Sequence, residues 1–128
     1  PAATQLEVYG DDFPTHDGTC VRDYIHVNDL CSAHKAAMNR LLSTEKLGAE
    51  AYNLGNGNGF SVKEVIDACR RVTGVDIGYR IVGRRAGDPA ELVGSADKAN
   101  HVLGWYPSFI ELDEIVRTAW DWMQRNSK

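Results

Sequence analysis

The stretch that decides the fold is Asp17-Gly18-Thr19-Cys20-Val21-Arg22-Asp23-Tyr24-Ile25-His26-Val27-Asn28-Asp29-Leu30, which contains a turn, a short charged strand and the start of a helix. Side chains two residues apart in a strand lie on the same face, so Arg22 and Tyr24 are expected on one side. The planar guanidinium of Arg22 suits a diphosphate oxygen, and a tyrosine beside it suits a base or ribose. The pattern therefore favours a site for a phosphorylated nucleoside.

The composition is that of one globular domain or of a piece of a larger protein. The chain has 128 residues, and 43% of them are hydrophobic, which is enough for a core. No window approaches the roughly 20 apolar residues of a membrane span. Residues 1–5 have neither the basic flank nor the apolar run of a signal peptide. A cytoplasmic protein without membrane contact is therefore expected.

Charge and ligand spacing narrow the function classes further. The net charge of -4 argues against broad nucleic-acid binding, which depends on clustered Lys and Arg. An anionic ligand must therefore meet local positive charge, which Arg22 and the Arg84-Arg85 pair supply, although from spacing alone a solvated loop is the interpretation we favour for that pair. Neither the cysteines nor the histidines have the spacing of a disulfide framework or a zinc site. Reduced cysteines and no metal are expected.

Hydrophobic periodicity predicts a mixed α/β fold. Strands are expected at about 5–9, 21–26, 51–54 and 78–82. A helix capped by Asn28 or Asp29 is expected next to a second one with a capping box from Ser61 to Glu64 and a C-cap at Gly74. A short helix from 95 to 104 and a final helix after Pro107 complete the prediction. The residues expected to be buried on these helices are Leu30, Ala33, Ala37, Met38, Leu41, Leu42, Val62, Val65, Ile66, Cys69, Val72, Leu112, Ile115, Val116, Ala119 and Met123.

Signatures of catalysis are missing from the sequence. Residues 55–59 (GNGNG) follow an expected strand and open a helix, as a dinucleotide-binding fingerprint does, but Phe60 stands where the third glycine is required. A permissive glycine turn is the interpretation we favour for this segment. The sequence also lacks a Tyr-x-x-x-Lys pair and a G-x-S-x-G elbow. No catalytic, cofactor-binding or metal-binding residue is therefore expected in this chain.

Motifs along almost the whole chain resemble UDP-glucose 4-epimerases, in the order found in that family. They are VYGDD at 8–12, PTHDGT at 14–19, the stretch 21–30, YNLG at 52–55, RRAGDP at 84–89 and DKA at 97–99. The Arg-Asp-x-x-x-Val-x-Asp segment is also similar to one in nucleotide-sugar dehydratases and decarboxylases. The preceding Pro-Thr-x-Asp-Gly-Thr insertion is typical of the UDP-galactose epimerases, so the epimerase branch is favoured.

This resemblance implies an extended short-chain dehydrogenase/reductase, in which an N-terminal Rossmann domain binds NAD and carries a catalytic Tyr-x-x-x-Lys pair. Residues 1–128 would be the C-terminal UDP-sugar-binding region, with that NAD-binding domain absent from this chain. The whole enzyme would interconvert UDP-glucose and UDP-galactose by oxidation and re-reduction at C4, in galactose metabolism, whereas the isolated chain would be inactive. The alternatives are a non-catalytic UDP-sugar-binding module, a portion of a related dehydratase or decarboxylase, and a structural or interaction remnant.

The resemblance also implies a set of substrate-binding residues. Arg22 and Arg85 would contact the diphosphate from opposite sides, Asp88 would contact the ribose, and the backbone near Glu7 and Tyr9 would meet the uracil. Leu92 would bound the sugar end of the pocket, where a leucine would leave room for an N-acetyl group. The full expected set is Glu7, Tyr9, Arg22, Tyr24, Asn58, Arg85, Asp88 and Leu92.

Partners follow from the same resemblance, which assigns residues 28–54 partly to the Rossmann sheet and its covering helix. One strand and one helix of this chain would then complete that sheet. A strand at 51–54 without neighbours exposes backbone donors and acceptors, which favours pairing with another chain. The expected partners are a UDP-sugar, the Rossmann half of the enzyme and a second copy of the chain, as a homodimer or by self-association. No nucleic acid or membrane is expected.

Overall fold

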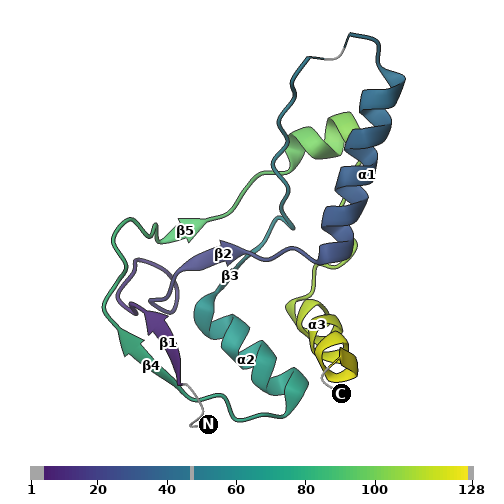
Figure 1. Ribbon diagram of the computed structural model, residues 1–128. Coiled ribbons are helices and arrows are strands. Elements are labelled where there is room, and N and C mark those ends of the chain that lie inside the picture. Colours follow the sequence, from purple (N-terminus) through teal and green to yellow (C-terminus); the bar gives the residue numbers. More distant parts are fainter. Residues whose placement is uncertain (1–4, 47, 127–128) are drawn as a thin grey trace.

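The computed structural model describes residues 5–46 and 48–126 and has a mixed α/β fold, as predicted (Figure 1). In Figure 1 the strands, α2 and α3 form one body, from which α1 and η1 project together. The strands are β1 (Leu6–Tyr9), β2 (Val21–Asp23), β3 (Gly59–Ser61), β4 (Tyr79–Val82) and β5 (Glu91–Leu92). The helices are α1 (Val27–Ser43), α2 (Val62–Thr73), the short π-helix η1 (Ala99–Leu103) and α3 (Leu112–Asn126).

The strands form two small sheets. β1 pairs in parallel with β4, which sets Glu7 opposite Arg80. The other sheet has the order β3-β2-β5, with β2 antiparallel to β3 and parallel to β5. Because β2 is the central strand, Arg22 lies between Phe60 of β3 and Leu92 of β5.

Helix α2 has the boundaries that its capping residues predict. The Ser61 hydroxyl accepts from the Glu64 backbone N–H at 3.1 Å, and the Glu64 carboxylate accepts from the Ser61 N–H at 2.7 Å. Gly74 ends the helix with φ of 69°, a left-handed conformation that glycine adopts without strain. The Asp17 carboxylate accepts from the Ser61 hydroxyl and from the Thr19 N–H, which fixes the loop before β2 over this helix start.

The start of α1 differs from the sequence prediction. His26, and neither Asn28 nor Asp29, is the N-cap, because its Nδ1 accepts from the Asn28 backbone N–H at 3.0 Å. The buried Asp29 carboxylate instead accepts from the backbone N–H groups of Ser108 (2.8 Å) and Phe109 (3.0 Å). Asp29 therefore attaches the first turn of α1 to the segment that leads into α3.

The arm formed by α1 and η1 has a small core and a partly uncovered apolar surface. Ala33, Ala99 and Trp105 form the buried cluster, and the Trp105 indole donates to the Asp29 carbonyl at 3.0 Å. The prediction of full apolar burial is wrong toward the outer ends of both long helices, where several of the apolar side chains are exposed to solvent. The exposed residues are Met38, Leu41 and Leu42 on α1 and Ala119 and Met123 on α3.

The strand expected at 51–54 is also absent. Residues 49–54 run extended beside α1, and within the described residues none of their backbone groups pairs with another backbone group. Strand assignment requires a hydrogen-bonded neighbour, which this segment lacks. In the part of the chain that the structure describes, no helix has both the length and the hydropathy to cross a bilayer.

Candidate functional site

Two arginines from distant parts of the chain meet at one carboxylate. Arg22 in β2 places Nη2 3.5 Å from Oδ1 of Asp88, and Arg85 donates from Nε to Oδ2 of the same carboxylate at 3.1 Å. The side chains of Arg22 and Asp88 are only 24% and 23% exposed, whereas that of Arg85 is 64% exposed. The structure thus brings together the residues that were expected at the diphosphate and the ribose.

Backbone carbonyls hold the Arg22 guanidinium in place. Its Nη1 donates to the carbonyl of Val21 at 2.8 Å and to that of Pro89 at 3.0 Å. A guanidinium has five N–H donors in one plane, so it can serve these carbonyls and the Asp88 carboxylate together. Leu92, which is Arg22's partner in the β2–β5 register, lies exposed beside it.

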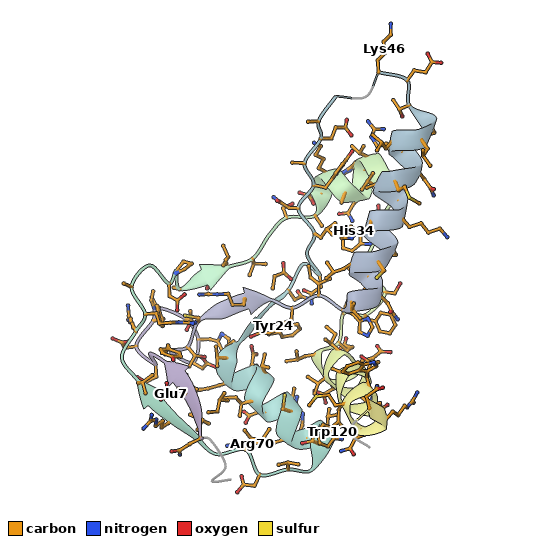
Figure 2. All side chains as sticks on the ribbon, in the orientation of Figure 1. Glu7, Tyr24, His34, Lys46, Arg70 and Trp120 are labelled. Atoms are coloured by element: carbon orange, nitrogen blue, oxygen red, sulfur yellow. The ribbon has the colours of Figure 1, made fainter. Side chains whose placement is uncertain are left out.

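Contacts continue from Arg85 to strand β1, where Glu7 is marked in Figure 2. The Arg85 guanidinium lies 4.4 Å from the centroid of the Tyr9 ring, a cation–π contact, and the Tyr9 hydroxyl donates to Glu7 Oε2 at 3.0 Å. Glu7 also forms an ion pair with Arg80 in β4, and the Arg80 guanidinium holds the pKa of Glu7 below its ordinary value. Glu7, Tyr9 and Arg80 line an open groove at this end of the site.

The neighbouring arginine points elsewhere. Arg84 donates from Nε to Asp12 Oδ1 at 2.6 Å, and its guanidinium lies 4.0 Å from the centroid of the Phe13 ring. Gly10 makes this packing possible, since a Cβ there would lie 2.7 Å from Arg84 Cγ. The Arg84-Arg85 pair is therefore divided, with Arg84 fixing the loop after β1 and Arg85 contacting Asp88.

Tyr24 and Asn58 are connected through Asn56. The Asn56 side chain donates from Nδ2 to the Tyr24 carbonyl and accepts at Oδ1 from the Asn58 backbone N–H, both at 2.9 Å. Burial raises the pKa of the Tyr24 hydroxyl, and the positive charge of Arg22 opposes this shift. Tyr24, which follows β2 in Figure 2, therefore lies within electrostatic reach of the arginine.

The arrangement is suited to binding an anion. Two guanidinium groups with one carboxylate between them retain net positive charge, and their unused N–H groups can donate charge-assisted hydrogen bonds to phosphate oxygens. Among the described residues, no three His, Cys, Asp or Glu side chains gather closely enough to hold a metal ion. The side chains gathered here have the chemistry to recognise and position an anionic ligand.

Three residues of this region were not predicted from the sequence. Arg80 pairs with Glu7, Asn56 connects Tyr24 to Asn58, and the Asp23 carboxylate accepts from backbone N–H groups of two loops. The strand alternation offers a signal for Asp23, because it places this side chain on the face opposite Arg22. No local pattern marks Asn56 or Arg80, since Asn56 reaches Tyr24 and Arg80 reaches Glu7 across long stretches of sequence.

Comparison with curated relatives reveals extensive similarity to part of one kind of enzyme. The UDP-glucose 4-epimerase of Halalkalibacterium halodurans is 50% identical over 118 residues, which is 92% of this chain and 35% of that relative. No family model matches the chain. The chain therefore spans about a third of the length of the curated relatives it matches.

Solved structures extend the similarity to the fold. The UDP-glucose 4-epimerase of Bifidobacterium longum, in complex with NAD+ and UDP, aligns with a TM-score of 0.88 and 42% identity over 98% of this chain and 36% of its own. The UDP-Glc/GlcNAc 4-epimerase of Campylobacter jejuni aligns with a TM-score of 0.83 and 44% identity over 96% and 36%. The resemblance and the fold class expected from the sequence are confirmed.

Proposed function

We propose that this chain, which matches UDP-glucose 4-epimerases over about a third of their length, is the UDP-sugar-binding portion of such an enzyme. The observation that carries the proposal is the meeting of Arg22 and Arg85 at Asp88. A pair of guanidinium groups at one point suits the pyrophosphate of a nucleotide sugar. The relative solved with NAD+ and UDP supports this choice of ligand.

In this proposal the bound diphosphate accepts hydrogen bonds from the guanidinium groups of Arg22 and Arg85. Asp88 accepts a hydrogen bond from a ribose hydroxyl and keeps the two guanidinium groups close together. Each charge-assisted hydrogen bond contributes roughly 1.5–3 kcal/mol. Tyr9 and Glu7 border the base through the groove beside β1, with Tyr24 and Asn58 at the nucleotide and Leu92 at the sugar. These residues bind and orient the substrate, and none of them transfers the hydride.

The proposed reaction of the whole enzyme is interconversion of UDP-glucose and UDP-galactose. NAD supplies the reversible oxidation at C4 when it is bound by the remaining part of such an enzyme, here proposed to be an N-terminal Rossmann domain. This chain supplies the positioning that brings the sugar to that cofactor. The isolated chain is expected to show no epimerase turnover.

The uncovered surface of α1 supports a partner that completes the fold. Met38, Leu41 and Leu42 are exposed, and within the part of the chain that the structure describes the extended segment 49–54 beside them forms no backbone–backbone hydrogen bond. In the whole enzyme we propose that the Rossmann half covers this surface, and in the isolated chain that a second copy does. The free cysteines Cys20, Cys31 and Cys69 agree with the proposed cytoplasmic setting.

Calorimetric titration of the chain with UDP, UDP-glucose and UDP-N-acetylglucosamine tests the binding role. Arg22→Ala and Arg85→Ala are each expected to weaken UDP binding at least about tenfold. Arg125→Ala, which removes an exposed arginine on α3, is the matched control and should leave Kd unchanged. Absence of UDP binding by the unsubstituted chain, or equal binding by the Arg22 and Arg85 variants, would contradict the proposal.

A second experiment separates the enzyme from a non-catalytic binding module. The chain is mixed with the remaining two thirds of a similar epimerase, and conversion of UDP-galactose to UDP-glucose is followed. Restored turnover that depends on Arg22 and Arg85 supports the epimerase. UDP binding without any restored turnover favours the binding module.

A further inference from the structure

We infer that Asp23 is a positioning residue for the proposed UDP-sugar site, because its carboxylate attaches two loops that carry binding residues to strand β2. The inference rests on the proposed function. Asp23 Oδ1 accepts from the backbone N–H of Asn56 at 3.2 Å, and Oδ2 accepts from that of Gly94 at 3.3 Å. Asn56 lies in the glycine-rich loop before β3, and Gly94 lies just after β5.

Two successive side chains of β2, Arg22 and Asp23, hold the two ends of segment 88–94, which contains β5. Arg22 binds the start of the segment at Asp88 and Pro89, whereas Asp23 binds its end at Gly94. Alternation along the strand sends the two side chains to opposite faces, so each end is held separately. Leu92 lies between these attachments and pairs with β2 itself. Its position at the sugar end therefore depends on both.

The glycine-rich loop is attached at the same carboxylate by close packing. A Cβ at Gly55 would lie 2.6 Å from Asp23 Oδ2 and 2.6 Å from the Gly94 carbonyl, so only glycine allows this approach. Asn56 is 8% exposed and extends the connection, through its side chain, to the Tyr24 carbonyl and the Asn58 N–H. The Asp23 carboxylate thus sets where the loop lies relative to β2 and β5.

The function of Asp23 depends on its two acceptor oxygens and not on its shape. Asparagine has nearly the same shape but only one acceptor oxygen, and its NH₂ group would face one of the two backbone N–H donors. In that variant, the backbone N–H that faces the NH₂ group loses its charged acceptor, which is a destabilising change. The Asp23→Asn substitution should therefore release one loop while the rest of the fold is kept.

The test combines calorimetry with hydrogen exchange on the 128-residue chain. Asp23→Asn is expected to raise Kd for UDP-glucose roughly tenfold, with no comparable change in the thermal midpoint. Amide exchange should accelerate at residues 54–58 and 92–96 but not within α2. Asn56→Ala, which removes the side-chain connection without changing charge, should give a smaller effect in the same direction. Asp76→Asn, at an exposed carboxylate outside the site, is the matched control.

The outcomes separate this inference from the function it rests on. If the unsubstituted chain binds UDP-glucose and Asp23→Asn binds it equally well, the positioning role is wrong and the proposed function stands. If Asp23→Asn loses binding only through global unfolding while Asn56→Ala binds normally, the residue is structural and the inference also fails. If the unsubstituted chain does not bind UDP or UDP-glucose, the proposed function itself is wrong.

Discussion

His26 and Thr118, 92 residues apart in the chain, are joined by a 2.7 Å hydrogen bond between the imidazole Nε2 and the threonine hydroxyl. Nδ1 of His26 accepts from the Asn28 N–H, so the ring proton lies on Nε2 and is donated to Thr118. The Thr118 hydroxyl donates in turn to the Ile115 carbonyl at 3.0 Å. The buried ring also stacks on Phe109 at a centroid distance of 3.9 Å. One imidazole therefore joins the start of α1 to α3.

Removing this hydroxyl should loosen the attachment of α3. We predict that Thr118→Val lowers the free energy of unfolding by about 1 kcal/mol, because the buried Nε2–H loses its acceptor. Thr118→Ser keeps the hydroxyl and should lie closer to the unsubstituted protein. Urea unfolding monitored by tryptophan fluorescence measures both. Equal stability of the Val and Ser variants would contradict the bond.

Asp29 should be among the most sensitive polar positions, because it is 2% exposed and both its oxygens accept from backbone N–H groups. Asp29→Asn replaces one acceptor by a donor that faces Ser108 or Phe109. We predict a loss of roughly 1–3 kcal/mol in the free energy of unfolding. Asp76→Asn, at an exposed position, serves as the control in the same urea titration. A change no larger than that of the control would refute the prediction.

Glu50 should make stability depend on acid pH. The Arg40 guanidinium, with help from the Tyr52 hydroxyl, lowers the pKa of Glu50 from 4.5 to about 2. A carboxylate whose pKa is lower in the folded state stabilises the fold above its ordinary pKa, and this contribution is lost as pH falls through the folded value. The thermal midpoint should therefore fall from pH 5 to pH 2. Glu50→Gln should flatten that slope, and added salt should weaken it, since the pair is exposed to solvent. Identical slopes for the two proteins would count against the pair.

Leu92 should affect which sugar is accepted. In an enzyme completed with the remaining two thirds of a similar epimerase, Leu92→Tyr should reduce turnover of UDP-N-acetylglucosamine more than that of UDP-glucose. The reason is steric, since a bulky ring beside Arg22 would crowd the N-acetyl group. The Campylobacter jejuni relative, named a UDP-Glc/GlcNAc 4-epimerase, makes both substrates reasonable to assay. Equal losses on both substrates would argue against a role in selectivity.

The apolar surface of α1 should drive self-association. Leu41 and Leu42 are 61% and 79% exposed. We predict that the isolated chain forms dimers or larger species in sedimentation velocity and that Leu41→Lys with Leu42→Lys shifts it toward monomer. Lys35→Glu on the same helix changes charge without removing apolar surface and is the control. A monodisperse, folded monomer at high concentration would exclude this prediction.

Local signals in the sequence were sufficient to predict helix boundaries where the interacting groups are neighbours in the chain. The capping box at Ser61 and Glu64 and the left-handed Gly74 depend on contacts within four residues, so α2 could be predicted from sequence. The cap of α1 could not, because Asp29 is a good cap by residue type but its carboxylate is occupied by the loop at 108–109. Burial on α1 and α3 was predicted too widely, because periodicity identifies an apolar face and not the partner that covers it.

By itself, the sequence determined the α/β class, the short strand that carries Arg22, and the resemblance that pointed to a nucleotide sugar. That resemblance already assigned Arg85, and not Arg84, to the expected site, but only the tertiary structure decided which groups hold each of these adjacent arginines. Arg84 and Arg85 have almost the same local sequence, but folding brings Asp12 and Phe13 to Arg84 and brings Tyr9, with the Asp88 carboxylate shared by Arg22, to Arg85. A guanidinium is directed by the carboxylate and aromatic groups around it, and groups distant in the chain meet only once the strands have paired.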